Sequence, residues 1–253
     1  MEISTRPVAL VTGGSRGIGA ASALALAERG YDVAITYRNK VSRANEVASE
    51  IEKRGVRAIS ICSDITRQED RERLFTTLRE WSNSLNVLVL NASGGLERDT
   101  LAADPDYPMH INRDAQLALV DAALPFMPAG STIVFVTSHW AHLHGQVVGI
   151  PIYASVAESK HAGEQALRAR QSELANQGIR LVVVTGDLIE GTITPKLMER
   201  TMPGLTEYRR STVGQLPTAT EMGEAIAGAA VDSTLPSGST VVIGGSLESL
   251  IRP

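Results

Sequence analysis

A glycine-rich turn near the N-terminus constrains the fold of this chain most strongly. The apolar run 8–11 has strand character, residues 18–29 have the composition of a helix, and the turn between them reads Thr-Gly-x3-Gly-x-Gly. Gly13 allows a sharp backbone turn, Gly17 leaves room beside a pyrophosphate, and Gly19 allows the helix to approach the strand closely. Because the free N–H groups at the start of a helix attract phosphate, this turn predicts a dinucleotide site. A tight strand-to-helix turn without any ligand is the alternative.

Strand and helix patterns alternate along most of the chain, which predicts a parallel sheet covered by helices on both faces. The expected strands are 8–11, 32–36, 56–62, 87–90, 132–137, 179–185 and 240–243, and the expected helices are 18–29, 43–54, 67–81, 112–127, 153–176 and 219–231. Since no domain boundary is visible, we expect one doubly wound α/β domain over 1–253. The segment 186–218 is longer than a routine connection and predicts a substrate-binding lid with an apolar wall.

Composition narrows the classes of protein that this chain can belong to. With 253 residues, 43% of them hydrophobic, the chain is long enough for one large core. The net charge is −4 and the basic residues are scattered, so we expect neither a nucleic-acid nor a membrane partner. No apolar run approaches the ~20 residues of a membrane span, and residues 1–7 lack the apolar core of a signal peptide. We therefore expect a soluble cytoplasmic protein, with the single cysteine, Cys62, as a small core residue.

The glycine turn and the alternating pattern together resemble the short-chain dehydrogenase/reductase family. The resemblance implies the family's doubly wound Rossmann fold, with a seven-stranded parallel sheet and a nicotinamide dinucleotide bound at its carboxyl edge. The contacts that it implies for the dinucleotide are Gly13, Ser15, Arg16, Gly17, Ile18 and Gly19 in the turn, Tyr37, Arg38 and Asn39, then Asp64 and Ile65, then Asn91, Ala92 and Ser93, and finally Gly186 and Ile189. Two of these residues have simpler alternatives: Asp64 is also typical of a helix cap or turn, and Asn91 of a link between neighbouring strands.

The end of the second strand indicates which dinucleotide binds. NAD enzymes usually place an acidic residue there to accept hydrogen bonds from the adenosine ribose. This chain has Tyr37-Arg38-Asn39 instead, and Arg16 lies inside the glycine turn. Two guanidinium groups at these places favour a 2′-phosphate, and hence NADP(H), over the alternative of two solvated surface arginines.

The family resemblance also implies a catalytic group. In the family a Tyr donates a proton, a Lys lowers its pKa and holds the ribose, a Ser positions the substrate oxygen, and an Asn anchors a water relay. The matching residues here are Tyr153, Lys160, Ser138 and Asn112, with Tyr153 and Lys160 also contacting the cofactor. A nearby ammonium is physically needed because a phenol of pKa near 10 is a poor base at neutral pH.

The spacing of the Tyr and the Lys departs from the common family pattern. Most members have Tyr-x3-Lys, whereas this chain has Tyr-x6-Lys, with Val156 at the usual Tyr position. On a continuous helix Tyr153 and Lys160 share a face, but the phenol lies about 4.5 Å further along the axis. A more remote phenol suits an enoyl thioester, and the spacing is similar to that of the family's enoyl-acyl-carrier-protein reductases.

Three histidines, His139, His142 and His144, follow the fifth strand at spacings that also occur in metalloproteins. No carboxylate or cysteine joins them in the sequence, so no metal is expected. We expect these side chains to border the substrate pocket or to lie on the surface.

Three functions agree with these patterns. The first is an NADPH-dependent reductase of a carbonyl, either a 3-oxoacyl thioester or another ketone. The second is an enoyl thioester reductase, and the third is an NADP(H)-binding regulator without catalysis. The partners expected are a small-molecule or acyl-thioester substrate and further copies of the chain, because the family commonly forms homotetramers through helices matching 112–127 and 153–176.

Overall fold

Seven parallel strands form one sheet in the computed structural model, which describes residues 6–251 apart from the side chain of Arg98. The strands are β1 (Val8–Val11), β2 (Asp32–Tyr37), β3 (Ala58–Cys62), β4 (Val87–Leu90), β5 (Thr132–Ser138), β6 (Arg180–Gly186) and β7 (Thr240–Ile243). Their order is β3-β2-β1-β4-β5-β6-β7, so the chain moves outward in one direction from β1 and in the other from β4. The predicted doubly wound fold is confirmed, and the reversal between β1 and β4 is where such sheets bind ligands.

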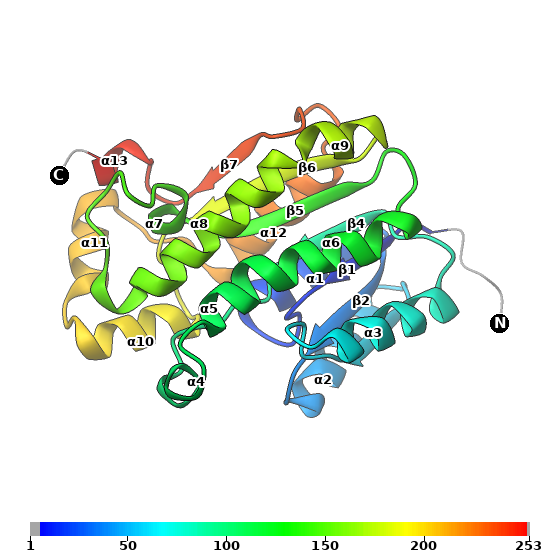
Figure 1. Ribbon diagram of the computed structural model, residues 1–253, viewed down its shortest axis with the longest axis horizontal. Coiled ribbons are helices and arrows are strands. Elements are labelled where there is room, and N and C mark those ends of the chain that lie inside the picture. The colour runs from blue at the N-terminus through cyan, green and yellow to red at the C-terminus, as the bar shows by residue number, and fades with distance from the viewer. Residues whose placement is uncertain (1–5, 252–253) are drawn as a thin grey trace.

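Helices cover both faces of the sheet, and Figure 1 shows α6 and α8 in front of the strands with α12 behind them. One face carries α1 (Gly17–Glu28), α2 (Val41–Glu52) and α12 (Ala219–Val231), and the other carries α3 (Gln68–Trp81), α6 (Ala115–Ala123), α8 (Ala154–Ala169) and α9 (Gln171–Asn176). Because both faces are buried, the central strands are continuously apolar: β1 is Val-Ala-Leu-Val and β4 is Val-Leu-Val-Leu.

The shorter helices lie at the ends of the strands and differ most from the sequence prediction. The structure adds α4 (Arg98–Ala103), α7 (His139–His142) and α13 (Glu248–Ile251), and the segment 186–218 contains α10 (Ile193–Thr201) and α11 (Leu205–Val213). The helix expected at 153–176 is divided into α8 and α9, and a 3-10 turn, η3 (Pro151–Tyr153), precedes it.

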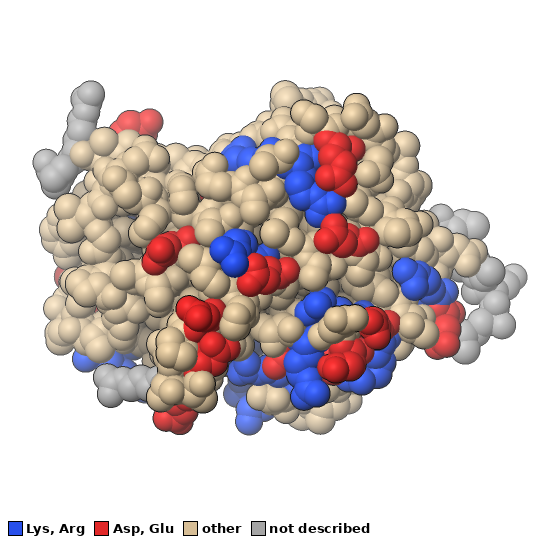
Figure 2. Space-filling view, viewed as in Figure 1, with Lys and Arg blue, Asp and Glu red and all other residues tan. Residues whose placement is uncertain are grey.

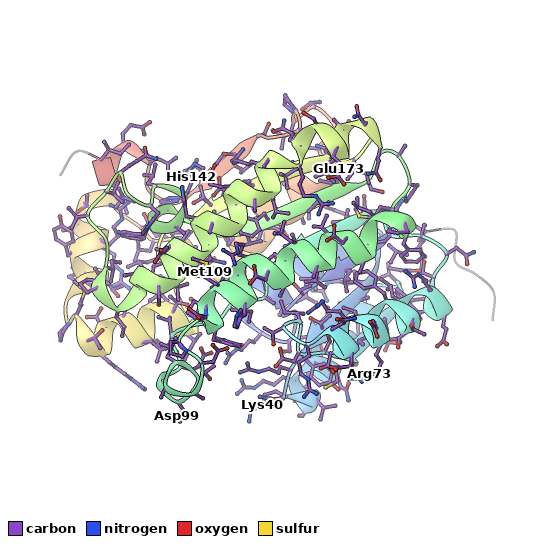
Figure 3. All side chains as sticks on the ribbon, viewed as in Figure 1. Lys40, Arg73, Asp99, Met109, His142 and Glu173 are labelled. Carbon is purple, nitrogen blue, oxygen red and sulfur yellow. The ribbon has the colours of Figure 1, made fainter. Side chains whose placement is uncertain are left out.

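The helix expected at 112–127 begins earlier and is irregular. It starts as α5 (Tyr107–Met109), passes through a π turn, η1 (His110–Asp114), continues as α6 and ends in a 3-10 turn, η2 (Leu124–Phe126). In Figure 3, Met109 marks the place where α5 meets the π turn. The π turn lies against α8, where a Cβ at Gly163 would overlap the carbonyl oxygen of Asn112. The close packing of these two segments therefore depends on a glycine.

Cys62 is exposed, so its prediction as a core residue was wrong. It ends β3, which is the edge strand of the sheet and has a neighbour on one side only. Its thiol lies 3.4 Å from the carbonyl oxygen of Arg38.

The surface carries mixed charges. Figure 2 shows acidic and basic side chains interspersed over this face, which agrees with the scattered charges in the sequence. Across residues 6–251, none of the helices has both the length and the apolar character needed to cross a membrane.

We predict that Gly163→Ala destabilises the protein by about 1–3 kcal/mol, because the new methyl group must push α8 away from the π turn. Gly228→Ala is the matched control, since it also lies in a helix, but among the described residues no atom outside the adjoining helix backbone lies within 4 Å of the added Cβ. That change should stabilise by about 0.5–1 kcal/mol through its effect on the unfolded chain. Denaturant unfolding measures both values, and equal values for the two variants would contradict the packing argument.

Candidate active site

A cavity of about 790 Å³ opens at the carboxyl edge of the sheet. It is lined by the segments that follow β1 to β6 and by α10, because parallel strands all end at the same edge. Ser138 and every predicted cofactor-binding residue except Asn39 line this cavity, whereas Asn39 is exposed and lies outside the lining. The structure thus brings residues from most of the chain to one site.

The glycine turn has the geometry that its sequence predicts. Gly13 has a φ of +66°, which favours glycine, and its N–H donates to the hydroxyl of Thr36 at 3.0 Å. A Cβ at Gly19 would overlap the carbonyl oxygen of Gly13. A Cβ at Gly17 would face open space, with the nearest atom of another described segment, Cγ2 of Thr192, 3.8 Å away. Among residues 6–251, no side chain caps the start of α1, so the N–H groups of its first turn remain available to an anion in the cavity.

Three arginines line the end of the cavity next to β2. Arg16 and Arg38 were predicted from the sequence, and Arg43, in the first turn of α2, was missed. The signal for Arg43 was a second arginine five residues after Arg38, on a helix that begins at the carboxyl edge. At the same end, the hydroxyl of Ser63 is buried without a hydrogen-bond partner among the described residues. Guanidinium groups and an unpartnered hydroxyl fit a phosphorylated nucleotide.

Asp64 and Asn91 have local structural partners as well as places in the cavity lining. One carboxylate oxygen of Asp64 accepts from the N–H and the hydroxyl of Thr66, at 3.1 and 2.7 Å. The amide of Asn91 donates to the carbonyl oxygen of Thr12 at 2.9 Å, and thus joins β1 to β4. The structure therefore contains both simpler alternatives, a turn contact at Asp64 and a link between neighbouring strands at Asn91.

Ser138 and Tyr153 meet at the other end of the cavity. The phenol of Tyr153 donates to Oγ of Ser138 at 3.1 Å, and the same oxygen accepts from the N–H of Ala141 at 3.2 Å. Ser138 thus accepts two hydrogen bonds, which leaves its own proton for a third partner. Burial raises the pKa of Tyr153 to about 12, despite the opposing effect of the bond to Ser138. The phenol is therefore protonated at neutral pH.

Lys160 lines the same cavity but is not hydrogen-bonded to Tyr153 within the described part of the chain. Its ammonium donates to the carbonyl oxygen of Val136 at 3.0 Å and lies 5.8 Å from the ring centre of Phe135. Burial lowers the pKa of Lys160 to about 8. Tyr153 is the last residue of η3 and the N-cap residue of α8, so the helix that carries Lys160 begins only after Tyr153.

Asn112 lies beside the cavity rather than in its lining. Its amide donates to the carbonyl oxygen of Gly94 and to Oγ of Ser159, both at 3.0 Å, and its carbonyl accepts from Ser93 at 2.8 Å. Asn112 therefore ties the loop after β4 to α8, next to Lys160. The structure does not join its side chain directly to Ser138, Tyr153 or Lys160.

None of the three histidines lines the cavity, and of the two expected places, the pocket border or the surface, the structure shows only the second, for the exposed His144. For His139 both expectations were wrong. His139 is fully buried, with Nε2 2.8 Å from the carbonyl oxygen of Gly245 and Nδ1 3.0 Å from the hydroxyl of Thr185. A carbonyl only accepts, so Nε2 carries the proton and Nδ1 accepts from Thr185. His142 bonds to Glu164 of α8, and Figure 3 shows His142 beside this helix. His144 is exposed.

No metal-binding cluster occurs among the described residues, in which no three His, Cys, Asp or Glu side chains are grouped to hold an ion.

A buried ion pair that sequence reasoning missed lies within the segment 186–218 and joins α11 to the end of β6. Arg209 of α11 lies 2.8 Å from Asp187, which follows β6, and both side chains are buried. Arg209 also donates to Ser249 at 2.9 Å and lies 5.5 Å from the ring centre of Trp140. Because Asp187 and Trp140 line the cavity, this pair fixes α11 and the segment after β7 against its wall.

The fold and this site define a dinucleotide-binding α/β protein, and comparison with known proteins identifies its family. The model of the short chain dehydrogenase family matches residues 7–201, so the chain belongs to this family.

Three similar proteins are informative. The chain is 36% identical to the hydroxynaphthalene reductase-like protein Arp2 of Metarhizium robertsii, over 65% of this chain and 61% of that protein. It is 30% identical to 1-cyclohexenylcarbonyl-CoA reductase of Streptomyces collinus, over 73% and 65%. The match thus spans less than two thirds of either relative. The crystal structure of the angucycline C-6 ketoreductase LanV with bound NADP is 27% identical, has a TM-score of 0.80 and covers 96% of both chains.

We predict that His139 makes stability fall as the pH is lowered. Burial lowers its pKa from 6.5 to about 4, so between these values the unfolded chain binds a proton that the folded chain does not. The stabilising contribution is therefore complete above about pH 6.5, and on the order of 1 kcal/mol is lost by about pH 5.5.

Denaturant unfolding at about pH 7.5 and about pH 5.5 measures this loss. His139→Gln keeps a donor and an acceptor but does not titrate, so it should lose less stability than the wild type, while the exposed control His144→Gln should behave like the wild type. An unchanged pH dependence in His139→Gln would contradict the assignment.

Proposed function

We propose that the protein is an NADPH-dependent oxidoreductase that reduces a ketone to an alcohol. The observation that carries the proposal is the hydrogen bond from Tyr153 to Ser138, which lies in the same cavity as the glycine turn and the three arginines. A proton donor and an anion-binding turn in one cavity are the two parts that such a reaction needs from the protein.

The residues at the β2 end of the cavity hold the cofactor in this proposal. The N–H groups at the start of α1 bind the pyrophosphate, and Arg16, Arg38 and Arg43 bind the 2′-phosphate that distinguishes NADPH from NADH. When bound, NADPH supplies the hydride. Gly186, the last residue of β6, and Ile189, three residues later, lie at the end of the cavity that receives the nicotinamide in this proposal.

Ser138 and Tyr153 act on the substrate oxygen. The hydroxyl of Ser138 donates a hydrogen bond to the carbonyl oxygen and orients it. The protonated phenol of Tyr153 transfers its proton to the same oxygen as the carbonyl carbon is reduced. Lys160 has two N–H groups left after its bond to Val136, and these hold the nicotinamide ribose. With a pKa of about 8, its ammonium is mostly charged at neutral pH and stabilises the tyrosinate.

The cavity and the relatives together support a cyclic ketone as the substrate, in preference to a 3-oxoacyl thioester. Trp140, Leu188 and Met198 line the cavity and belong to one apolar cluster with Tyr153, so this end of the cavity has an apolar, partly aromatic wall. Such a wall suits the flat face of a ring. Two of the similar proteins are named as a hydroxynaphthalene reductase-like protein and an angucycline C-6 ketoreductase.

An enoyl thioester reductase is the second candidate, and two observations favour it. Lys160 bonds to Val136 rather than to Tyr153, in line with the long Tyr-x6-Lys spacing, and one relative is named as a cyclohexenylcarbonyl-CoA reductase. NADPH oxidation with cyclic ketones, 3-oxoacyl thioesters and 2-enoyl thioesters separates the two candidates. An NADP(H)-binding regulator would bind NADPH and turn over none of them.

We predict that Tyr153→Phe lowers the rate of ketone reduction by about 10²–10⁴-fold, because it removes the proton donor and leaves the ring in place. NADPH binding, followed by fluorescence, should stay within a few-fold of the wild type. Tyr208→Phe is the control, since this tyrosine lies exposed on α11. Wild-type activity in Tyr153→Phe would show that another group donates the proton.

We also propose a homotetramer assembled through α6 and α8. These helices contact each other on one face of the sheet (Figure 1), and α8 exposes small side chains, including Ala154, Ser155 and Ala169. Small side chains allow helices of two copies to approach closely. Light scattering should give about four times the chain mass of 27.0 kDa, and the mass of a single chain would contradict this assembly.

A further inference from the structure

A hydrogen bond crosses the cofactor end of the cavity between two segments far apart in the sequence. Nη1 of Arg38 donates to the phenol oxygen of Tyr107 at 2.7 Å. Arg38 follows β2, Tyr107 begins α5, and both residues line the cavity. The side chains of Arg16 and Arg43 have no hydrogen bond or ion pair within the described residues, so the side chain of Arg38 differs from them in being held by the protein.

Tyr107 is itself firmly placed. Its side chain is 8% exposed and belongs to the core cluster that includes Ile111. A Cβ at Gly94 would lie 2.9 Å from Cε1 of Tyr107 and 3.3 Å from its hydroxyl oxygen, so the ring sits directly on the glycine backbone. Burial raises the pKa of Tyr107, which keeps the phenol neutral near pH 7 and leaves its oxygen available to accept from the guanidinium.

The bond leaves most of the guanidinium group free for a ligand. Arg has five N–H donors in a planar fork, and Tyr107 engages one of them, on Nη1. The edge formed by Nε and Nη2 can still contact two oxygens of a phosphate. A long, exposed side chain otherwise loses rotamer freedom when it binds, and a fixed partner reduces that loss.

We propose that Tyr107 is a positioning residue that holds Arg38 ready for the 2′-phosphate and thereby increases the preference of the protein for NADPH over NADH. The inference rests on the proposed cofactor site, but it concerns a residue that the sequence did not mark and that acts through Arg38. In this proposal Tyr107 increases the selectivity for NADPH without contacting the 2′-phosphate itself.

The test compares binding of NADPH, NADH and 2′,5′-ADP to the full chain by fluorescence and calorimetry, without any substrate. Tyr107→Phe should raise the Kd of NADPH and of 2′,5′-ADP by about five-fold and leave the Kd of NADH unchanged, because only the phosphate contact depends on Arg38. Tyr31→Phe, a partly buried tyrosine outside the cavity, is the matched control and should change none of the three.

A double-mutant cycle distinguishes action through Arg38 from a separate effect. In the Arg38→Met background, Tyr107→Phe should have no further effect on NADPH binding, whereas in the Arg43→Met background it should keep its full effect. An unchanged Kd of NADPH, an equal loss for NADPH and NADH, or tighter NADPH binding in Tyr107→Phe would each overturn the proposal. If the wild type shows no preference for NADPH, the cofactor assignment itself fails. If that preference is present and Tyr107→Phe is neutral, only the role of Tyr107 fails.

Discussion

The hydrogen bond between the phenol of Tyr153 and the hydroxyl of Ser138 is the interaction on which the rest of this account depends. Ser138 lies in the cavity because β5 ends at the same edge as the glycine turn after β1. Tyr153 lies there because η3 ends at this residue, directly before α8. A parallel sheet places its strand ends together, so residues distant in the sequence share one cavity. Burial there keeps the phenol protonated, which suits a proton donor.

Buried polar contacts around the cavity hold its walls in place. Asn112 ties the loop after β4 to α8, and the pair of Asp187 and Arg209 ties α11 to the end of β6. His139 joins the start of α7 to Gly245, two residues after β7. Breaking one partner of such a contact leaves a buried polar group unpaired, so each contact constrains the shape of the wall more than a surface bond would.

The sequence predicted the sheet because strands buried on both faces are continuously apolar, and it predicted the glycine turn because each glycine has a separate steric role. It did not predict the exposure of Cys62, which depends on β3 being the edge strand, or the burial of His139, whose partners are 46 and 106 residues away. The π turn at Asn112 packs against Gly163 of another helix. Local patterns predict elements, whereas these features arise from the contacts between elements.

The most direct test of the central claim follows the hydride itself. The wild-type protein is incubated with NADPH carrying deuterium at the nicotinamide C4 position and with a cyclic ketone, and the product is examined by NMR. We expect deuterium on the carbon that bears the new hydroxyl group, since Ser138 and Tyr153 act on the oxygen of that carbon. No transfer to any ketone, together with deuterium at the β carbon of a 2-enoyl thioester, would contradict it.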